Sequence, residues 1–393
     1  MDPPSKLMAQ SMPPTPKLAK TEKEKASGPE DPKAKADKKT EDARQQNKKA
    51  QDRDLPRFGG KDVKNQESEI TTAKDTYELV TELGQGSFGA VYGVIRQSDK
   101  KGFALKCESV NMKRSMLPHE ANVLLALNLL KSPHFVEMVD HGTVRGRFLF
   151  VVIKLVGKNL WDVRVSLEEK KFSLTTALLI AEQTLAGLRD LHRVGWLHRD
   201  LKPPNFCIGR EGDESFHTVF ILDFGLCRKV AMKGKDIRVP RKECAFRGTT
   251  RYASIAAHDG KEQSRKDDIE AWWYMVAEMM VIDLPWKAIR GTERETVRSM
   301  KWRLREDEEF MKFLFRKCCY EQMNTILLYL DSLVYHSIPD YDFVYRHIKC
   351  ATIVYKCDLT ECPDWDPKGR DEKKKYRGPV YQEGEPYIVK ELE

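Results

Sequence analysis

The chain has 393 residues, of which 40% are hydrophobic and 33% charged, and its net charge is +8. The length suggests two domains, or one large domain with tails, and the hydrophobic content is ordinary for a soluble globular protein. The positive charge is too small to indicate nucleic-acid binding by itself. It suits a surface that meets phosphates or acidic peptides.

The cysteine content argues against a disulfide-bonded secreted protein. There are nine cysteines, an odd number, and none forms a CxxC pair or a metal-type cluster with histidines. A reducing compartment is therefore expected. The N-terminus lacks the apolar stretch of a signal peptide, and the longest apolar run, residues 272–286, is interrupted by Glu278 and Asp283. We expect an intracellular protein, cytoplasmic or nuclear or both, that does not bind membranes.

Residues 1–70 form a segment of their own in composition. They contain 16 Lys or Arg against 13 Asp or Glu, and the first aromatic residue is Phe58. Such a segment cannot bury enough apolar surface to offset its chain entropy, so we expect a disordered tail. A nucleic-acid-binding arm is the alternative, but the mixed charges argue against it. Residues 363–393 are again polar and Lys-rich, and we expect a second tail there.

Between these tails, a small strand-rich part precedes a larger helical part. Runs rich in β-branched and aromatic residues predict strands at residues 77–83, 91–95, 102–107 and 148–156. From residue 173 apolar residues recur every three or four positions, which predicts an amphipathic helix with Ser173 as its N-cap. Further helical stretches are expected at residues 267–282 and 322–335. The pattern predicts an α+β fold.

The first motif is a glycine-rich turn between two strands. Three glycines let such a turn approach phosphates closely, with backbone N–H groups directed at them. A dinucleotide-binding fold would need a helix directly after the motif, whereas residues 91–95 continue as a strand. An ordinary glycine-rich turn is the alternative. The residues expected at this phosphate-covering hairpin are Leu83, Gly84, Gln85, Gly86, Ser87, Phe88, Gly89, Ala90 and Val91.

The second motif is Lys106, which lies within an apolar strand. A lysine in such surroundings must meet an anion or lose its charge. Beside a phosphate-covering turn it can neutralise nucleotide phosphates. Glu120 opens an apolar helical stretch and can pair with Lys106, although a solvated glutamate is the simpler interpretation.

The third motif is the run HRDLKPPN at residues 198–205. Asp200 can accept the proton of an attacking hydroxyl, and Lys202 can neutralise a phosphoryl group during its transfer. Asn205 supplies an oxygen ligand for a hard cation, and Asp223, in the DFG run after an apolar strand, supplies a carboxylate for Mg²⁺. Together these parts match what phosphoryl transfer requires: positioning, charge neutralisation and an aligned nucleophile.

Over residues 77–350 the sequence resembles the eukaryotic protein kinases. The resemblance implies a bilobal fold, with an N-lobe at 77–155 and a C-lobe at 156–350, and ATP bound with Mg²⁺ in the cleft. It places the hinge at Lys154 to Val156 and Ile153 at the gatekeeper position. Lys202 in HRDLKPPN is typical of the Ser/Thr branch.

A narrower resemblance, to the casein kinase I family and its tau-tubulin kinase branch, rests on GTTRYASI (248–255), QSRKDDIE (263–270), LPW (284–286) and the late Asp364-Trp365. The common Ala-Pro-Glu motif is replaced by Ser254-Ile-Ala, so the anchoring of this segment must come from elsewhere. Asp268 matches the carboxylate that holds the catalytic loop.

The family resemblance also implies the substrate class. Casein kinase I enzymes favour acidic or already phosphorylated protein segments, and Arg251 and Lys287 match part of their anion site, whereas an expected later lysine aligns with Val297. Arg199 and Arg228 are further candidates for binding a substrate anion. We therefore expect protein substrates with acidic or phosphorylated segments, and no nucleic-acid partner.

The activation loop has an unusual composition. Residues 226–247 contain no Ser, Thr or Tyr, but eight Lys or Arg against Asp236 and Glu243. A solvated basic loop is one interpretation; the other is an enzyme that is active without loop phosphorylation and binds an outside anion. Two functional alternatives remain: a pseudokinase scaffold, which would normally have lost Lys106, Asp200 or Asp223, and a basic protein that binds polyanions.

Overall fold

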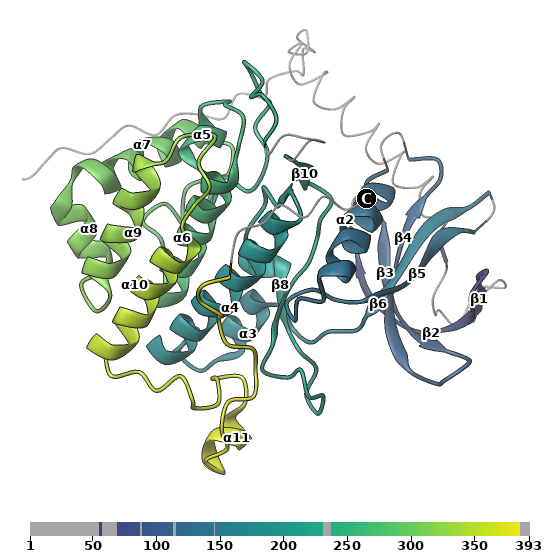
Figure 1. Cartoon of the computed structure of the whole chain (residues 1–393). Coiled ribbons are helices and arrows are strands. Elements are labelled where there is room, and N and C mark those ends of the chain that lie inside the picture. The colour runs from purple at the N-terminus through teal and green to yellow at the C-terminus, as the bar shows by residue number, and fades with distance from the viewer. Residues whose placement is uncertain are drawn as a thin grey trace, which may run out of the picture. The chain divides into compact units, whose positions relative to one another are not determined.

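The structure, a computed structural model, describes residues 55–56, 69–86, 89–112, 115–144, 146–230 and 237–385. All of them belong to one unit, Ala50–Glu393. A strand-rich N-lobe and a helical C-lobe follow each other along the chain (Figure 1), which confirms the expected α+β bilobal fold. The tail predicted at 1–70 lies outside the described residues except at 55–56 and 69–70. None of the described helices combines the length and apolarity needed to cross a membrane.

The N-lobe is built on an antiparallel sheet with the strand order β1-β2-β3-β4-β6-β5. Its large apolar side chains lie on a buried face, as the alternating strand pattern requires; Tyr77, Val94, Leu105 and Phe148 are all at most 2% exposed. They form a core of their own. The strands are Glu69–Thr71 (β1), Thr76–Gln85 (β2), Ala90–Arg96 (β3), Gly102–Ser109 (β4), Met138–Val144 (β5) and Phe148–Lys154 (β6).

The only long N-lobe helix among the described residues is α2 (Leu117–Leu130), which packs against β5 and β6. Its start is fixed by Glu108 at the end of β4, whose carboxylate accepts two backbone N–H groups at the first turn (2.8 and 3.0 Å). These groups have no partner inside the helix, so the carboxylate replaces a cap. Strand β4 thereby sets the position of Glu120 relative to Lys106.

The C-lobe is centred on two buried helices, α4 and α6, which contact each other and most of the surrounding elements. Ser173 caps α4 as expected, because its hydroxyl accepts the N–H of Thr176 (3.2 Å). The elements are α3 (Leu160–Ser166), α4 (Leu174–Arg193), β7 (Trp196–Leu197), η1 (Pro203–Asn205), β8 (Phe206–Ile208), β9 (Val219–Ile221), β10 (Arg228–Lys229), α5 (Ile255–His258), α6 (Arg265–Val281), α7 (Arg294–Glu306), α8 (Glu308–Leu314), α9 (Tyr320–Ser332), α10 (Tyr341–Val354) and α11 (Pro367–Asp371).

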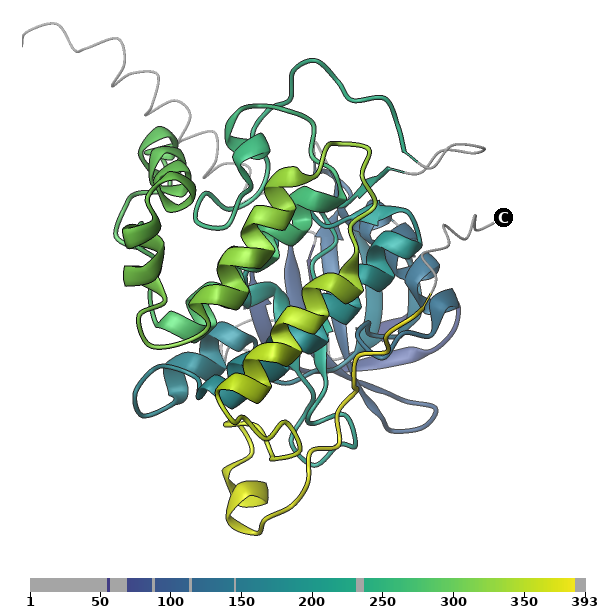
Figure 2. The ribbon, with the colours of Figure 1, turned by 60° about the vertical axis from the view of Figure 1, so that its left-hand side comes forward.

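The C-terminal segment differs from the expected disordered tail over residues 363–385. After α10 it passes through α11 and returns along the C-lobe (Figure 2). Tyr381 is 5% exposed, stacks on Tyr345 with ring centres 4.2 Å apart, and donates its backbone N–H to Glu182 (2.8 Å). A few aromatic anchors thus attach a segment whose average composition is polar, which explains why composition alone predicts a tail.

Candidate functional site

The glycine-rich motif forms the predicted hairpin between β2 and β3. Gly84 and Gln85 pair with Val91 and Ala90 across the two strands, and no helix follows. A side chain at Gly89 would place its Cβ 1.9 Å from the carbonyl oxygen of Cys107, so this glycine is sterically required. Ser87 and Phe88 lie outside the described residues. Leu83 is half exposed beside the turn.

Lys106 and Glu120 form the predicted pair, with Nζ and Oε2 2.6 Å apart. Lys106 lies on β4 opposite Val91 of the hairpin. Burial alone would lower the pKa of Lys106, but the nearby carboxylates of Glu120 and Asp223 outweigh it and raise the pKa. The lysine is therefore held as a cation between the hairpin and the start of the DFG run.

The predicted hinge residues lie at the end of β6 and directly after it. Lys154 ends this strand, and its ammonium donates to the hydroxyl of Ser215 (3.0 Å) and lies over the ring of Phe220. Val156 is partly buried against the C-lobe core. The side chain of Lys154 is thus engaged by the 209–218 loop, and its backbone N–H donates to the oxygen of Glu137 (2.9 Å).

The HRDLKPPN run folds as a tight loop in which the predicted residues converge. The carboxylate of Asp200 accepts the ammonium of Lys202 at one oxygen (2.6 Å) and the hydroxyl of Thr249 at the other (2.7 Å). Asn205 donates its side-chain N–H to the backbone oxygen of Asp200 (2.8 Å). Its amide oxygen is therefore the atom that could ligate a cation.

Asp268, on the first turn of α6, supports this loop as the family resemblance implies. Its two oxygens accept the backbone N–H groups of His198 (2.6 Å) and Arg199 (2.8 Å), and His192 donates to it as well (2.9 Å). Burial alone would raise the pKa of Asp268, but the bonds from His192 and the backbone hold it below its usual range. The bonds also fix Arg199 in a left-handed conformation, with φ of 65°.

Asp223 is the second loop residue with a left-handed backbone, at φ of 63°. The next residue, Phe224, is buried against the ring of His198, with centres 5.9 Å apart, and His198 bonds the backbone oxygen of Leu222 (3.1 Å). These contacts link the DFG run to the catalytic loop. Non-glycine residues in this conformation are uncommon and cluster at functional sites.

A cavity of about 340 Å³ lies beside Lys202 and Thr249. Arg251 lines it and is engaged from behind, because its guanidinium pairs with the fully buried carboxylate of Glu278 (3.2 Å). Lys287 pairs with Asp283 (2.5 Å) and presents its backbone oxygen to Arg251 (3.2 Å). The structure thus brings Arg251 and Lys287 together next to the catalytic loop.

Arg199 and Arg228 form a separate basic group. Arg199 donates twice to the backbone oxygen of Leu226 (2.9 and 2.7 Å), and Arg228 pairs with Glu262 (3.3 Å), which also binds Arg241. Burial and the adjacent charge of Arg228 lower the pKa of Arg199. The four cations predicted to bind an anion therefore occupy two sites, and each already has a partner within the protein.

The sequence analysis missed two features of the segment after the activation loop. One is the hydrogen bond of Thr249 to Asp200. The other is the anchor of the segment in which Ser254-Ile-Ala replaces the common Ala-Pro-Glu motif. Glu270 of α6 accepts the N–H of Ile255 (3.1 Å) and pairs with Arg305 of α7 (2.9 Å). Glu270 lies in the predicted helix 267–282, but no local pattern distinguishes it from its acidic neighbours.

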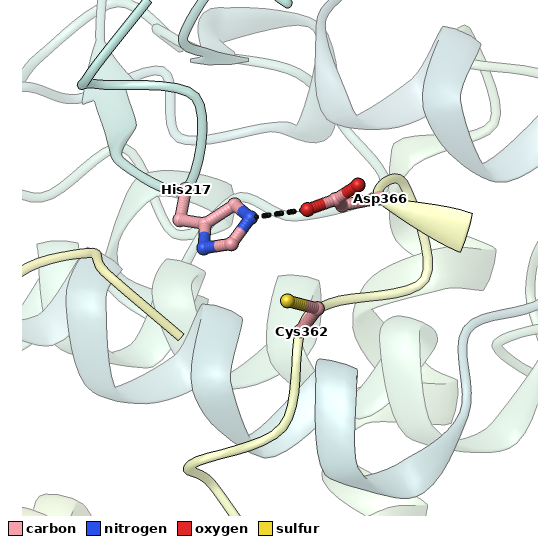
Figure 3. Close-up of side chains that lie close together, drawn as sticks. All are labelled: His217, Cys362 and Asp366. Carbon is pink, nitrogen blue, oxygen red and sulfur yellow. Dashed lines mark hydrogen bonds and ion pairs between the residues drawn. The ribbon is translucent and has the colours of Figure 1, made fainter. Parts of the chain in front are cut away.

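A second polar cluster joins His217, which lies between the HRDLKPPN and DFG runs, to Cys362 and Asp366 near the end of the chain (Figure 3); the atoms that could bind a metal lie within 4.8 Å of one another. Each of the three has a protein partner. His217 bonds Asp366 through Nε2 (2.8 Å) and accepts the backbone N–H of Arg377 at Nδ1 (3.1 Å). The thiol of Cys362 donates to the backbone oxygen of Lys374 (3.3 Å). Because Nδ1 is the acceptor, Nε2 carries the proton and cannot bind a metal. The cluster instead fastens the C-terminal segment to the 209–218 loop.

Comparison with known proteins agrees with this geometry. The protein kinase domain family matches residues 77–327. The serine/threonine-protein kinase spe-6 of Caenorhabditis elegans is 35% identical over 301 residues, which cover 76% of this chain and 77% of that protein. A protein of Dictyostelium discoideum named as a probable serine/threonine-protein kinase is 30% identical over 294 residues, 75% of this chain and 57% of the other. The chain therefore belongs to the protein kinase family and is a serine/threonine-protein kinase.

Proposed function

We propose that this kinase transfers the γ-phosphoryl group of ATP, with Mg²⁺, to Ser and Thr hydroxyls of acidic or phosphorylated protein segments, as casein kinase I enzymes do. The observation that carries the proposal is the convergence of Asp200, Lys202 and Thr249 beside a cavity lined by Arg251. A proton acceptor, a cation for the moving phosphoryl group and a surface for the substrate thus lie next to one another.

Each residue has a distinct role in this proposal. Asp200 orients the substrate hydroxyl and accepts its proton, and Lys202 neutralises charge on the phosphoryl group. Lys106, held by Glu120, contacts the nucleotide phosphates beneath the glycine hairpin. Bound Mg²⁺ would supply further charge neutralisation. Asn205 and Asp223 would hold it, since an amide oxygen and a carboxylate are the ligands that a hard cation prefers.

The test is a transfer assay with casein, ATP and Mg²⁺, in which mass spectrometry locates the phosphate on the product. Phosphoserine or phosphothreonine that disappears on chelation of Mg²⁺ is the expected result. A pseudokinase scaffold or a polyanion-binding protein would bind casein, in a salt-dependent way for the latter, without transferring phosphate.

Substrate choice is tested at Arg251. Charge-assisted hydrogen bonds contribute roughly 1.5–3 kcal/mol, so Arg251→Ala should lower kcat/KM for a pre-phosphorylated peptide by about 10- to 100-fold. The unphosphorylated form of the same peptide should lose less. The measurement is the ratio of the two kcat/KM values in wild type and variant.

Because Arg251→Ala also leaves Glu278 without its cation, two further variants are needed. Lys287→Ala removes the neighbouring charge without exposing a buried carboxylate, and Arg303→Ala removes a surface arginine that pairs with Asp307 and lies over the ring of Phe310. Lys287→Ala should shift the ratio in the same direction and Arg303→Ala should not. An equal loss on both peptides in Arg251→Ala would refute selective recognition of the phosphate.

Regulation follows from the hydroxyl-free activation loop. The first hydroxyls after it, on Thr249 and Thr250, are both engaged: Thr249 donates to Asp200 (2.7 Å), and Thr250 is 8% exposed and donates to the oxygen of Gly291 (2.8 Å). We expect protein produced together with a phosphatase, and shown by mass spectrometry to be unmodified over residues 226–252, to be fully active. Activity that arises only after phosphorylation of Thr249 or Thr250 would contradict this.

A further inference from the structure

Lys301, in the middle of α7, is a buried lysine whose amino group has no carboxylate partner among the described residues. Its side chain is completely inaccessible. The amino group donates to the backbone oxygens of Ala253 (2.6 Å) and Thr250 (3.1 Å) and lies 3.2 Å from Nε2 of His258. Burial lowers the pKa of Lys301 well below its usual range, and an amine with two N–H donors can still serve both carbonyls.

The rings of Tyr274 and Trp286 lie against this amino group. It lies 4.4 Å from the ring centre of Tyr274 and 5.5 Å from that of Trp286. Rings attract a cation but do not replace water, and a lysine is almost never fully buried unless it is paired. The energetic cost of burial is therefore offset mainly by the bonds to the two backbone oxygens, and the role of Lys301 should be sought in the segment that carries them.

That segment, residues 249–253, connects the catalytic base to the substrate cavity. Thr249 bonds Asp200, and Arg251 lines the cavity beside Lys202. The backbone oxygen of Arg251 is bound as well, by the indole N–H of Trp286 (2.8 Å). Three of the five carbonyls in this stretch are thus held by side chains of the C-lobe, one by Trp286 in the connection between α6 and α7 and two by Lys301 of α7.

We propose that Lys301 is a positioning residue for the protein substrate: it holds the Thr250 and Ala253 carbonyls so that residues 249–253 present Thr249 to Asp200 and Arg251 to the cavity. The inference rests on the proposed use of this cavity by the substrate. Lys301 does not contact the substrate, and it lies on a different element from the nucleotide-binding hairpin. Its removal should therefore affect use of the protein substrate and leave use of ATP unchanged.

The alternative is that Lys301 only stabilises the fold, and the two roles can be separated. Methionine has nearly the length and volume of the lysine stem, so Lys301→Met keeps the contacts with Tyr274 and Trp286. The two carbonyls lose their donor in this variant, so a small loss of stability is expected, while the apolar packing of the site is kept. What the methionine cannot do is bind the two carbonyls, which are then free to shift.

The experiment compares Lys301→Met, Lys301→Gln and the surface control Lys312→Met by steady-state kinetics and thermal unfolding. Displacement of a positioning group by about 1 Å can cost on the order of 10²-fold, so kcat/KM for casein should fall by about that much in Lys301→Met. The KM for ATP should stay near wild type, and the melting temperature should fall by only a few degrees. Lys301→Gln, which keeps N–H donors on a shorter side chain, should restore part of the loss, and Lys312→Met should match wild type.

Each other outcome overturns the inference. Unchanged kinetics for casein in Lys301→Met would show that the segment is held without Lys301. A parallel rise of both KM values, or failure of both Lys301 variants to fold, would assign the residue to stability alone. The proposed function is judged separately, by whether the wild-type protein transfers phosphate to casein.

Discussion

Asp223→Ala should lower kcat for phosphate transfer by about 10²- to 10³-fold, the usual effect of removing one preorganised electrostatic group from a transition state. The carboxylate is the proposed ligand for Mg²⁺, and it also contributes to the field that keeps Lys106 protonated. Its loss therefore weakens two charges directed at the nucleotide phosphates. The measurement is kcat at saturating casein and ATP over a range of Mg²⁺ concentrations.

The matched control is Asp213→Ala, which removes an exposed carboxylate from the 209–218 loop. It should behave as wild type at every Mg²⁺ concentration. Since Asp223 has a positive φ, alanine adds some backbone strain, and Asp223→Asn provides a second variant in which the residue type tolerates this conformation better. Retention of near wild-type turnover by both Asp223 variants would show that the metal-ligand assignment is incorrect.

The sequence predicts the parts of the site whose chemistry is local. In the HRDLKPPN run, the DFG run and the glycine turn, the functional residues lie within a few positions of one another. So short a stretch of chain can adopt only a few conformations. The pair of Lys106 with Glu120 could also be anticipated, because a cation within an apolar strand needs an anion nearby. The strand and helix pattern was sufficient to identify the two lobes and the N-cap of α4 at Ser173.

Contacts between distant segments could not be predicted in the same way. The pairing of Glu270 with Arg305, and the bond from Thr249 to Asp200, join residues 35 and 49 positions apart. Nothing in the local pattern selects these partners. The attachment of residues 363–385 depends on single aromatic residues such as Tyr381, whose effect is lost in an average over a polar segment.

Lys301 is an intermediate case, because a signal was present. Val297, Lys301 and Leu304 are spaced by four and three residues along α7 and are all buried. A lysine in the middle of an apolar helical stripe must either extend to solvent or meet buried acceptors. The sequence therefore marks the position as unusual, but only the structure identifies the carbonyls of Thr250 and Ala253 as the acceptors.

Asp200→Asn should reduce kcat by about 10²- to 10⁴-fold, the range of general base catalysis, with little change in the KM for ATP. Asparagine has the same shape as aspartate. Its oxygen can still accept the ammonium of Lys202, and its N–H₂ group can donate to the hydroxyl of Thr249, which can reverse its own direction. The local structure should thus persist while the proton acceptor is lost.

The role of Asp200 as a base can be separated from its hydrogen bond to Thr249 with Thr249→Val. This variant leaves Asp200 intact and removes its bond to residues 249–253. If Asp200 acts as the base, Thr249→Val should lose much less activity than Asp200→Asn, and the double variant should resemble Asp200→Asn alone. If Asp200 served only to fix the segment through Thr249, the two single variants would be equally impaired. Equal losses at unchanged melting temperature would therefore remove Asp200 from the chemical step, and the carboxylate would be left with a purely structural role in this loop.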